Sequence, residues 1–357
     1  MNVSDTKPLA NDRLDLRAGD WVEVRSVEEI LATLDDLGSL DGLPFMPEML
    51  QYCSRRFQVF KSAHKTCDTI ATYRNRRMNN AVHLEGLRCD GAAHDGCQAA
   101  CLLFWKEAWL KPVPGPESTG GRTEEASTKV DGLSGKASRC DVEILTRAAR
   151  VKAGTPESPE ELHRCQATEL VRATTPLKWW DPRQYVRDLL SRNVGLWDFL
   201  RYGALAALKA GMRLYWRVGQ YWDIRGSAGH KTPTANLNLR PGELVQVRSK
   251  KEILGTLNVE ARNRGLSFDV EMAPYCGRTF QVLSRVEKII NDKNGKMIHL
   301  PNGCIILDGV TCSGCLSRRR MFCPRAIYPY WREIWLKRVV SVGTAGGHTT
   351  GNRPENR

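Results

Sequence analysis

The chain has 357 residues, of which 53 are Lys or Arg and 40 are Asp or Glu, so its formal net charge is +13. Hydrophobic residues make up 41% and charged residues 26%, which is typical of a globular protein and excludes collagen-like, fully disordered and integral membrane classes. The length leaves room for about two domains. Residues 1–17 mix acidic and basic side chains without an apolar core, unlike a secretory signal peptide, so we expect a cytoplasmic protein.

The first predicted elements follow Gly19. Alternating apolar side chains over residues 21–24 predict a short strand. Ser26 and Glu29 form a capping-box pattern, which predicts the start of a short helix over 27–34. An apolar run over 57–60 predicts a further strand.

The same pattern returns later in the chain. Residues 19–34 recur at 242–257, an offset of 223, with ten of sixteen positions identical, and residues 42–59 recur at 265–282 with eleven of eighteen. A match this long does not arise by chance, so we define module one as 19–111 and module two as 242–338.

The residues outside the modules divide by composition. Pro, Gly, Ser and Glu predict a flexible linker, whereas Ser158-Pro159 and Asp181-Pro182 are helix start signals. The expected segments are a disordered N-terminus 1–18, module one 19–111, a flexible linker 112–141, a helical connecting segment 142–225, a linker 226–241, module two 242–338 and a disordered tail 339–357.

Module two adds two local signals. Asn294-Gly295 within 292–296 predicts a hairpin turn, because both residues tolerate the positive φ angles that such turns need, and 305–307 is the expected partner strand. Trp331 and Trp335 are four residues apart, which predicts a helix that carries both on one face.

These elements support a fold class by resemblance. The module opening resembles KOW-type and other SH3-like modules over about thirty residues. Through residues 43–49, 83–91, 104–110 and 327–336, the chain also resembles a group of bacterial proteins that carry this tandem pair and have no assigned activity. The expected fold is α+β and mainly β, with two small SH3-like barrel modules that contain short helices and are joined by a helical linker segment.

Cysteines are the main chemical signal. Ten of the twelve lie in the modules, five in each, and we interpret Cys140 and Cys165 outside them as incidental. In a reducing compartment, clustered cysteines favour metal or iron–sulfur ligation over disulfides, although a free cysteine can also be a small buried hydrophobic residue. Three pairs align between the copies: Cys53 with Cys276, Cys89 with Cys312, and Cys97 with Cys323.

A zinc ion or a [4Fe–4S] cluster takes four ligands, so each module needs one more. We choose Cys67 in module one and Cys304 in module two, because both sit beside the strand pair expected to approach the first cysteine. We expect about one centre per module and leave zinc and the cluster as alternatives. The alternative ligands are His64, His94, Cys101 and Cys315.

No catalytic constellation is evident, so we predict a metal- or iron–sulfur-binding accessory or scaffold protein that acts through a protein partner. Electron transfer is an alternative if the centres are iron–sulfur. Nucleic-acid binding is another, because module two carries a net charge of +8 and module one −2. The candidate nucleic-acid residues are Arg318, Arg319, Arg320 and Arg325. The basic and aromatic stretch 196–222 suits a membrane surface or docking within the protein, and we favour docking.

Overall fold

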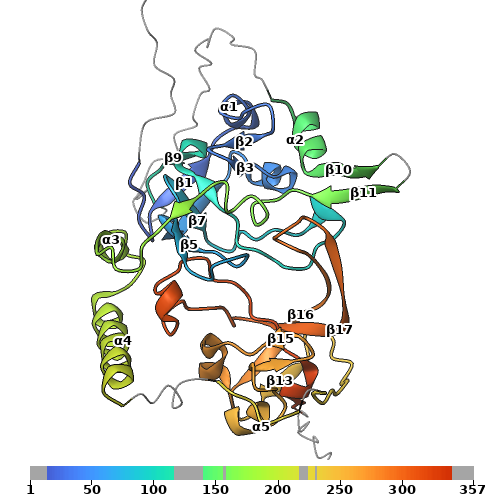
Figure 1. The fold of residues 1–357 in the computed structure, drawn as a ribbon. Coiled ribbons are helices and arrows are strands. Elements are labelled where there is room, and N and C mark those ends of the chain that lie inside the picture. The colour runs from blue at the N-terminus through green and yellow to red at the C-terminus, as the bar shows by residue number, and fades with distance from the viewer. Residues whose placement is uncertain (1–13, 116–139, 156–157, 217–223, 230, 340–357) are drawn as a thin grey trace, which may run out of the picture.

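The computed structural model describes residues 14–115, 140–155, 158–216, 224–229 and 231–339, and Figure 1 shows how they are arranged. The fold mixes helices and strands, with somewhat more strand, in small sheets. Most of the predicted tails and of the 112–141 linker lies outside the described residues. Within the described part, no helix is long and apolar enough to cross a membrane.

Module one forms an open five-stranded sheet. Its elements, with 3-10 helices labelled η, are β1 (Trp21–Val24), α1 (Val27–Leu31), β2 (Ser39–Leu40), β3 (Leu43–Pro44), η1 (Pro47–Tyr52), β4 (Arg56–Ser62), β5 (Lys65–Cys67), β6 (Asn75–Arg77), β7 (Ala81–Leu84), η2 (Ala92–His94), β8 (Trp105–Lys106), η3 (Glu107–Trp109) and β9 (Leu110–Pro112). The strand order is β8-β7-β4-β1-β9, and no pairing between the described edge strands β8 and β9 closes it. The sheet is therefore a half-barrel rather than a closed barrel.

Module two repeats this order in a four-stranded sheet. Its elements are β13 (Leu244–Val247), α5 (Lys250–Leu254), β14 (Arg262–Asn263), β15 (Leu266–Ser267), η5 (Val270–Tyr275), β16 (Thr279–Ile290), β17 (Met297–Leu307), η6 (Arg318–Arg320), η7 (Glu333–Trp335) and β18 (Leu336–Arg338). The order β17-β16-β13-β18 corresponds strand for strand to β7-β4-β1-β9. The sequence repeat is thus matched by a repeated sheet arrangement.

The connecting segment is only partly helical. Its elements are α2 (Val142–Ala148), β10 (Arg150–Thr155), β11 (Ser158–His163), β12 (Thr175–Pro176), α3 (Arg183–Leu190) and α4 (Leu196–Trp216). The prediction of a helix start at Ser158 was wrong, because β11 pairs with β10 along six residues as a hairpin. The start predicted at Asp181-Pro182 is confirmed by α3, and residues 191–195 separate α3 from α4.

Local signals predicted the module openings correctly. Ser26 accepts a hydrogen bond from the Glu29 amide while the Glu29 carboxylate accepts one from the Ser26 amide, which is the capping box expected from the sequence. Ser249 and Glu252 repeat both bonds in module two. At the predicted hairpin turn, Gly295 has a φ of +74°, which explains why glycine stands there.

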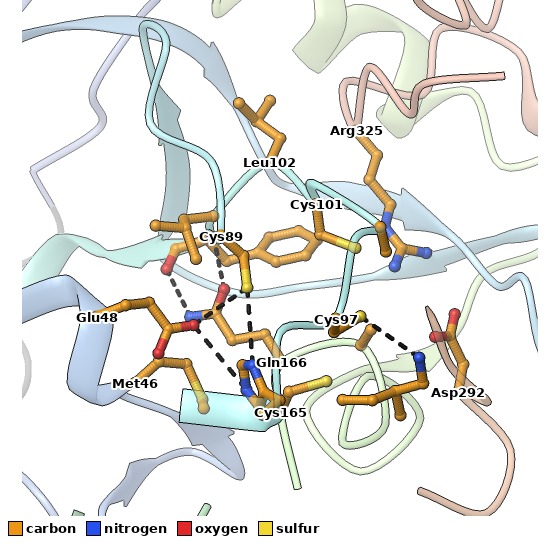
Figure 2. Close-up of a pocket in the computed structure, with 16 residues that line it drawn as sticks. Met46, Glu48, Cys89, Cys97, Cys101, Leu102, Cys165, Gln166, Asp292 and Arg325 are labelled. Carbon is orange, nitrogen blue, oxygen red and sulfur yellow. Dashed lines mark hydrogen bonds and ion pairs between the residues drawn. The ribbon is translucent and has the colours of Figure 1, made fainter. Parts of the chain in front are cut away.

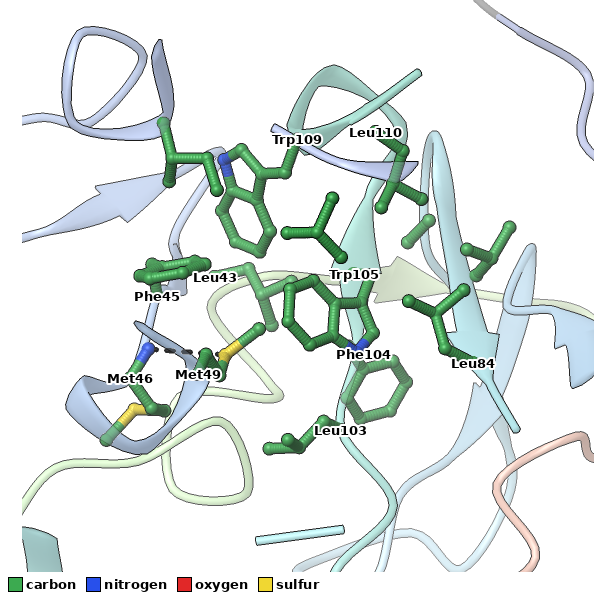
Figure 3. Close-up of a cluster of buried hydrophobic side chains, with 14 of the residues drawn as sticks. Leu43, Phe45, Met46, Met49, Leu84, Leu103, Phe104, Trp105, Trp109 and Leu110 are labelled. Carbon is green, nitrogen blue, oxygen red and sulfur yellow. Dashed lines mark hydrogen bonds between the residues drawn. The ribbon is translucent and has the colours of Figure 1, made fainter. Parts of the chain in front are cut away.

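The paired tryptophans do not lie on a helix. Trp331 forms an isolated antiparallel bridge with Ile305, and the chain then passes through the short η7 into β18, so the predicted helix over 331–337 was wrong. The four-residue spacing instead places both indoles edge-on to Phe268, at centroid distances of 6.2 and 5.5 Å. Trp105 and Trp109 pack in the same way around Phe45 in module one (Figure 3). Large buried rings therefore anchor the core of each module.

The β16–β17 hairpin joins module two to the rest of the molecule. Its turn meets β11, where the His163 amide donates to the Gly295 carbonyl at 2.8 Å (Figure 1). Farther along β16, the Gln98 side chain accepts hydrogen bonds from the Glu287 and Lys288 amides at 2.6 and 3.1 Å. The hairpin thus lies against the cysteine-containing loop of module one.

Candidate metal centre

Four cysteines line one small cavity where module one, the connecting segment and module two meet. Cys89, Cys97 and Cys101 come from module one and Cys165 from the residues after β11. The cavity has a volume of about 30 Å³, enough for an ion or a water molecule. Figure 2 shows the four thiols around a common space. Arg325 of module two also lines the wall.

Three potential ligands of different types lie closest together in this cavity. Ligand atoms of Glu48, Cys89 and His94 all lie within 4.8 Å of one another. The Cys89 Sγ is 3.2 Å from Glu48 Oε1 and 3.9 Å from His94 Nδ1. Thiolate, imidazole and carboxylate are the three side-chain groups that bind zinc in proteins. Within the described residues, this is the one group of three or more such side chains at that spacing.

Short elements of module one bring these three side chains together. Glu48 lies in the first turn of η1, which begins at Pro47, and His94 ends η2. Between Cys89 and η2, Gly91 adopts a φ of +77°, and a Cβ there would lie 2.1 Å from the carbonyl oxygen of Cys97. Glycine at this position therefore lets the chain after Cys89 fold directly onto Cys97.

The connecting segment is fastened to the cavity by Gln166. Its side-chain amide donates to the carbonyl oxygens of Pro44 and Phe104 at 3.1 and 2.9 Å, and its carbonyl oxygen accepts from the Phe104 amide at 2.8 Å. Gln166 is buried, so these bonds are shielded from water. They hold the neighbouring Cys165 beside the cysteines of module one.

Burial disfavours the charged forms of the groups around the cavity. It raises the pKa of Glu48 and lowers the pKa of His94 to about 4. Burial also raises the pKa of Cys89, with the Glu48 charge as the next cause, and raises the pKa of Cys101 to about 11 and that of Cys165 to about 12. A bound cation would reverse this preference, because its charge stabilises thiolate and carboxylate ligands.

Two buried polar atoms in the cavity have no hydrogen-bond partner among the described residues. They are Glu48 Oε2 and His94 Nε2, both with negligible solvent exposure. A buried polar atom without a partner is costly, so such atoms point to a group that is needed to complete the site. Both atoms belong to residues of the closely spaced trio, and both can bind a metal ion.

The structure distributes the predicted ligands differently from the sequence scheme. Cys89 and Cys97 line the cavity, as do the alternatives Cys101 and His94, whereas Cys67 contacts Cys323 of module two. The alternative ligand His64 lies 3.2 Å from Asp188 of α3 in a buried ion-pair network.

The remaining predicted ligands sit elsewhere. Cys53 and Cys276 end the equivalent helices η1 and η5 and pack against their module cores. The Cys304 thiol lies 3.4 Å from Arg332 Nη1. In the described part of the chain, these three thiols do not line the cavity.

Sequence reasoning missed Cys165 and Glu48. Cys165 lies outside the repeat, and nothing in its local sequence indicates that the chain returns to module one there. Glu48 did carry a signal, because it recurs as Glu271 at the repeat offset within otherwise apolar surroundings. Both residues become recognisable as neighbours of Cys89 only in three dimensions.

The predicted nucleic-acid residues do not form one exposed patch. The Arg320 guanidinium pairs with Asp269 at 2.5 Å, and Arg325 is buried. Arg319 is exposed, and the side chain of Arg318 is outside the described part. At least two of the four charges are therefore directed inward rather than toward a phosphate backbone.

Comparison with known proteins yields no match. No protein-family model fits the chain, and neither a curated protein nor a solved structure is significantly similar to it.

Proposed function

We propose that this chain is a metal-binding accessory protein with its primary centre in the cavity around Cys89. The observation that carries the proposal is the convergence of four thiols, a buried carboxylate and a neutral imidazole on that cavity. The centre would join module one to the connecting segment. It would therefore stabilise the assembled fold, since the free energy of metal binding is in part folding free energy.

A single zinc ion is the occupant that the geometry favours. Glu48, Cys89 and His94 supply three ligand atoms at the spacing of one ion, and a water supplies the fourth. The small volume supports the same occupant, as do the two atoms of the trio that form no hydrogen bond with the described residues. In this proposal the metal organises structure, and zinc carries out no redox reaction.

A [4Fe–4S] cluster is the second candidate, favoured by the four cysteines. Each thiolate of such a cluster binds a different iron, so its ligands are spaced more widely than those of one ion. Cys89, Cys97, Cys101 and Cys165 meet this description, although the cavity would have to widen. This occupant would extend the proposal to electron transfer.

Two variants separate the candidates. Metal content by mass spectrometry and absorbance at about 400 nm would be measured on anaerobically purified protein. If zinc is bound, His94→Ala loses it and Cys165→Ser keeps it. If a cluster is bound, Cys165→Ser loses the absorbance and His94→Ala retains it. Unchanged metal in both variants would contradict the proposal.

The wider role remains part of the proposal. The repeated strand order supports a common SH3-like origin for the modules, and thiol ligands suit a reducing cytoplasm. We infer that the protein acts through a protein partner. The inward-directed Arg320 and Arg325 weigh against the nucleic-acid alternative.

A further inference from the structure

A second group of cysteines meets across the boundary between the modules. Cys67, at the end of β5, donates its amide hydrogen to the Sγ of Cys323 at 3.2 Å, and both residues are buried. The contact is reinforced on each side: Asn75 donates to the Met321 carbonyl at 3.1 Å, and Arg325 donates to the Cys67 carbonyl at 3.2 Å. The β5–β6 hairpin of module one is therefore docked on the 321–325 loop of module two.

The Cys312-x-x-Cys315 turn packs on the same loop. The Phe322 amide donates to the Gly314 carbonyl at 2.9 Å. Gly314 has a φ of +69°, and a Cβ there would lie 2.7 Å from the Cys323 nitrogen. This is the arrangement that Gly91 and Cys97 adopt in module one, so the backbone between Cys312 and Cys315 packs directly on the backbone of Cys323.

Three adjoining segments form a common environment for these four cysteines. Cys67 ends β5, Cys312 and Cys315 flank the Gly314 turn, and Cys323 lies in the loop on which that turn packs. Within the described residues, no three of their sulfur atoms lie within 4.8 Å of one another, so metal binding would draw the segments closer together.

Buried cations surround this environment. Lys65 is fully buried, and its partner Asp188 is shared with His64. Arg325 is 4% exposed, and no carboxylate in the described part lies within ion-pair distance of it. A buried guanidinium needs a compensating negative charge, and a group of metal-bound thiolates supplies one.

We propose that Cys67, Cys312, Cys315 and Cys323 form a second, four-thiolate site that binds a thiophilic metal centre and fastens the two modules together. Either Zn²⁺ or an iron–sulfur cluster uses this ligand chemistry. The site shares no ligand with the cavity around Cys89, so either centre can exist without the other. It also explains why Cys67 faces module two rather than the cysteines of its own module.

Metal stoichiometry of the full-length protein tests this inference. The protein would be reconstituted anaerobically with Zn²⁺ alone or with Fe²⁺ and sulfide, and bound metal would be counted per chain. The wild type should hold two centres, about two zinc ions or about eight irons. Cys67→Ser and Cys89→Ser should each lose half, the double variant should lose all, and the control Cys276→Ser should lose none.

The outcomes separate the two sites. A single centre that Cys89→Ser removes and Cys67→Ser leaves intact would overturn the second site and retain the proposed function. A single centre with the opposite response would support the second site and overturn the cavity. Loss of only one centre in the double variant would show that Cys67 and Cys89 serve the same centre, which also overturns the inference.

Alkylation of the wild type provides a check that does not depend on the folding of a variant. Bound metal should protect Cys312 and Cys315, the partly exposed members of the set, from iodoacetamide, and removal of the metal by a chelator should leave both open to labelling, as read by peptide mass spectrometry. Equal labelling of these two cysteines before and after chelation would overturn the second site.

Discussion

Modules one and two place different side chains on the same backbone frame. In both, a glutamate lies in the first turn of a 3-10 helix, and a Cys-x-Gly turn packs on a second cysteine. The amide of that cysteine donates to His94 in module one and to Arg320 in module two, so these residues are structurally equivalent. Histidine can bind a metal, whereas arginine cannot.

Glu48 and Glu271 also differ, and again the residue of module one is the better placed to bind a metal. Glu271 accepts hydrogen bonds from the Ser313 hydroxyl and from the Leu316 and Ser317 amides at 2.6 to 2.8 Å. Glu48 accepts a hydrogen bond from the Cys89 thiol, and within the described residues its Oε2 has no partner. The loop that follows Cys312 in module two supplies the donors that satisfy its carboxylate. Module one keeps its carboxylate available for a ligand. The two modules therefore share a backbone arrangement but differ in whether this glutamate is hydrogen-bonded within its own module.

The largest expected effect is on metal affinity at the two glutamates. Glu48→Gln should weaken zinc binding by roughly 100-fold, because it removes an anionic ligand. The matched variant Glu271→Gln should leave the affinity of the cavity around Cys89 unchanged. Competition titration against a chromogenic chelator measures both, and equal losses would show that the modules do not differ in this respect.

The next largest effect should be a loss of stability from steric strain at Gly91 and Gly314, the equivalent glycines of the two modules. Gly91→Ala should destabilise the protein by about 3 kcal/mol or more, because its Cβ would meet the Cys97 backbone and its φ is positive. Gly314→Ala should cost less, since its nearest contact is 2.7 Å rather than 2.1 Å.

Gly86→Ala is the control for this glycine comparison. Gly86 has a φ of +70°, and a Cβ added there would have nothing within 4 Å, so only the backbone cost of about 1 kcal/mol should remain. Urea unfolding measures all three variants. An equal loss at Gly86 and Gly91 would rule out the close approach to Cys97.

The two glutamates should also differ in their contribution to stability, and here Glu271 should matter more than Glu48. In metal-free protein, Glu271→Gln should cost about 2 kcal/mol, because charged hydrogen bonds to three donors are weakened. Glu48→Gln should cost little, because burial already raises the pKa of that carboxyl toward its neutral form. Thermal unfolding after chelation tests this contrast. A larger loss of stability in Glu48→Gln than in Glu271→Gln would contradict it.

The smallest effect should come from the helix caps, where both modules should lose the same amount of stability. Ser26→Ala and Ser249→Ala each remove one half of a capping box, and each should cost about 1 kcal/mol. Parallel denaturation curves test this expectation. A clear difference between the two would mean that the helices α1 and α5 contribute unequally to their modules.

The sequence could predict features that depend on nearby residues. Ser26 with Glu29 and Asn294 with Gly295 specify their structures within a few positions, and the repeat aligned Cys89 with Cys312. It could not show that Cys165 returns to module one, or that Cys67 meets Cys323 across 256 positions. Those contacts depend on how the β10–β11 and β16–β17 hairpins dock, which no local pattern specifies.

The Trp331 segment shows a different limit. A four-residue spacing places two side chains together on a helix, but a strand bridge followed by a single 3-10 turn does so as well. The buried partner Phe268, rather than the spacing alone, decides the outcome.

Anomalous diffraction from crystals of anaerobically purified protein tests the central claim most directly. Data collected at the zinc and iron absorption edges would locate any bound metal without relying on a variant. We expect an anomalous peak in the cavity bounded by Glu48, Cys89 and His94, at the zinc edge for a single ion and at the iron edge for a cluster. Well-ordered crystals of freshly purified protein with no anomalous peak in that cavity would contradict the account.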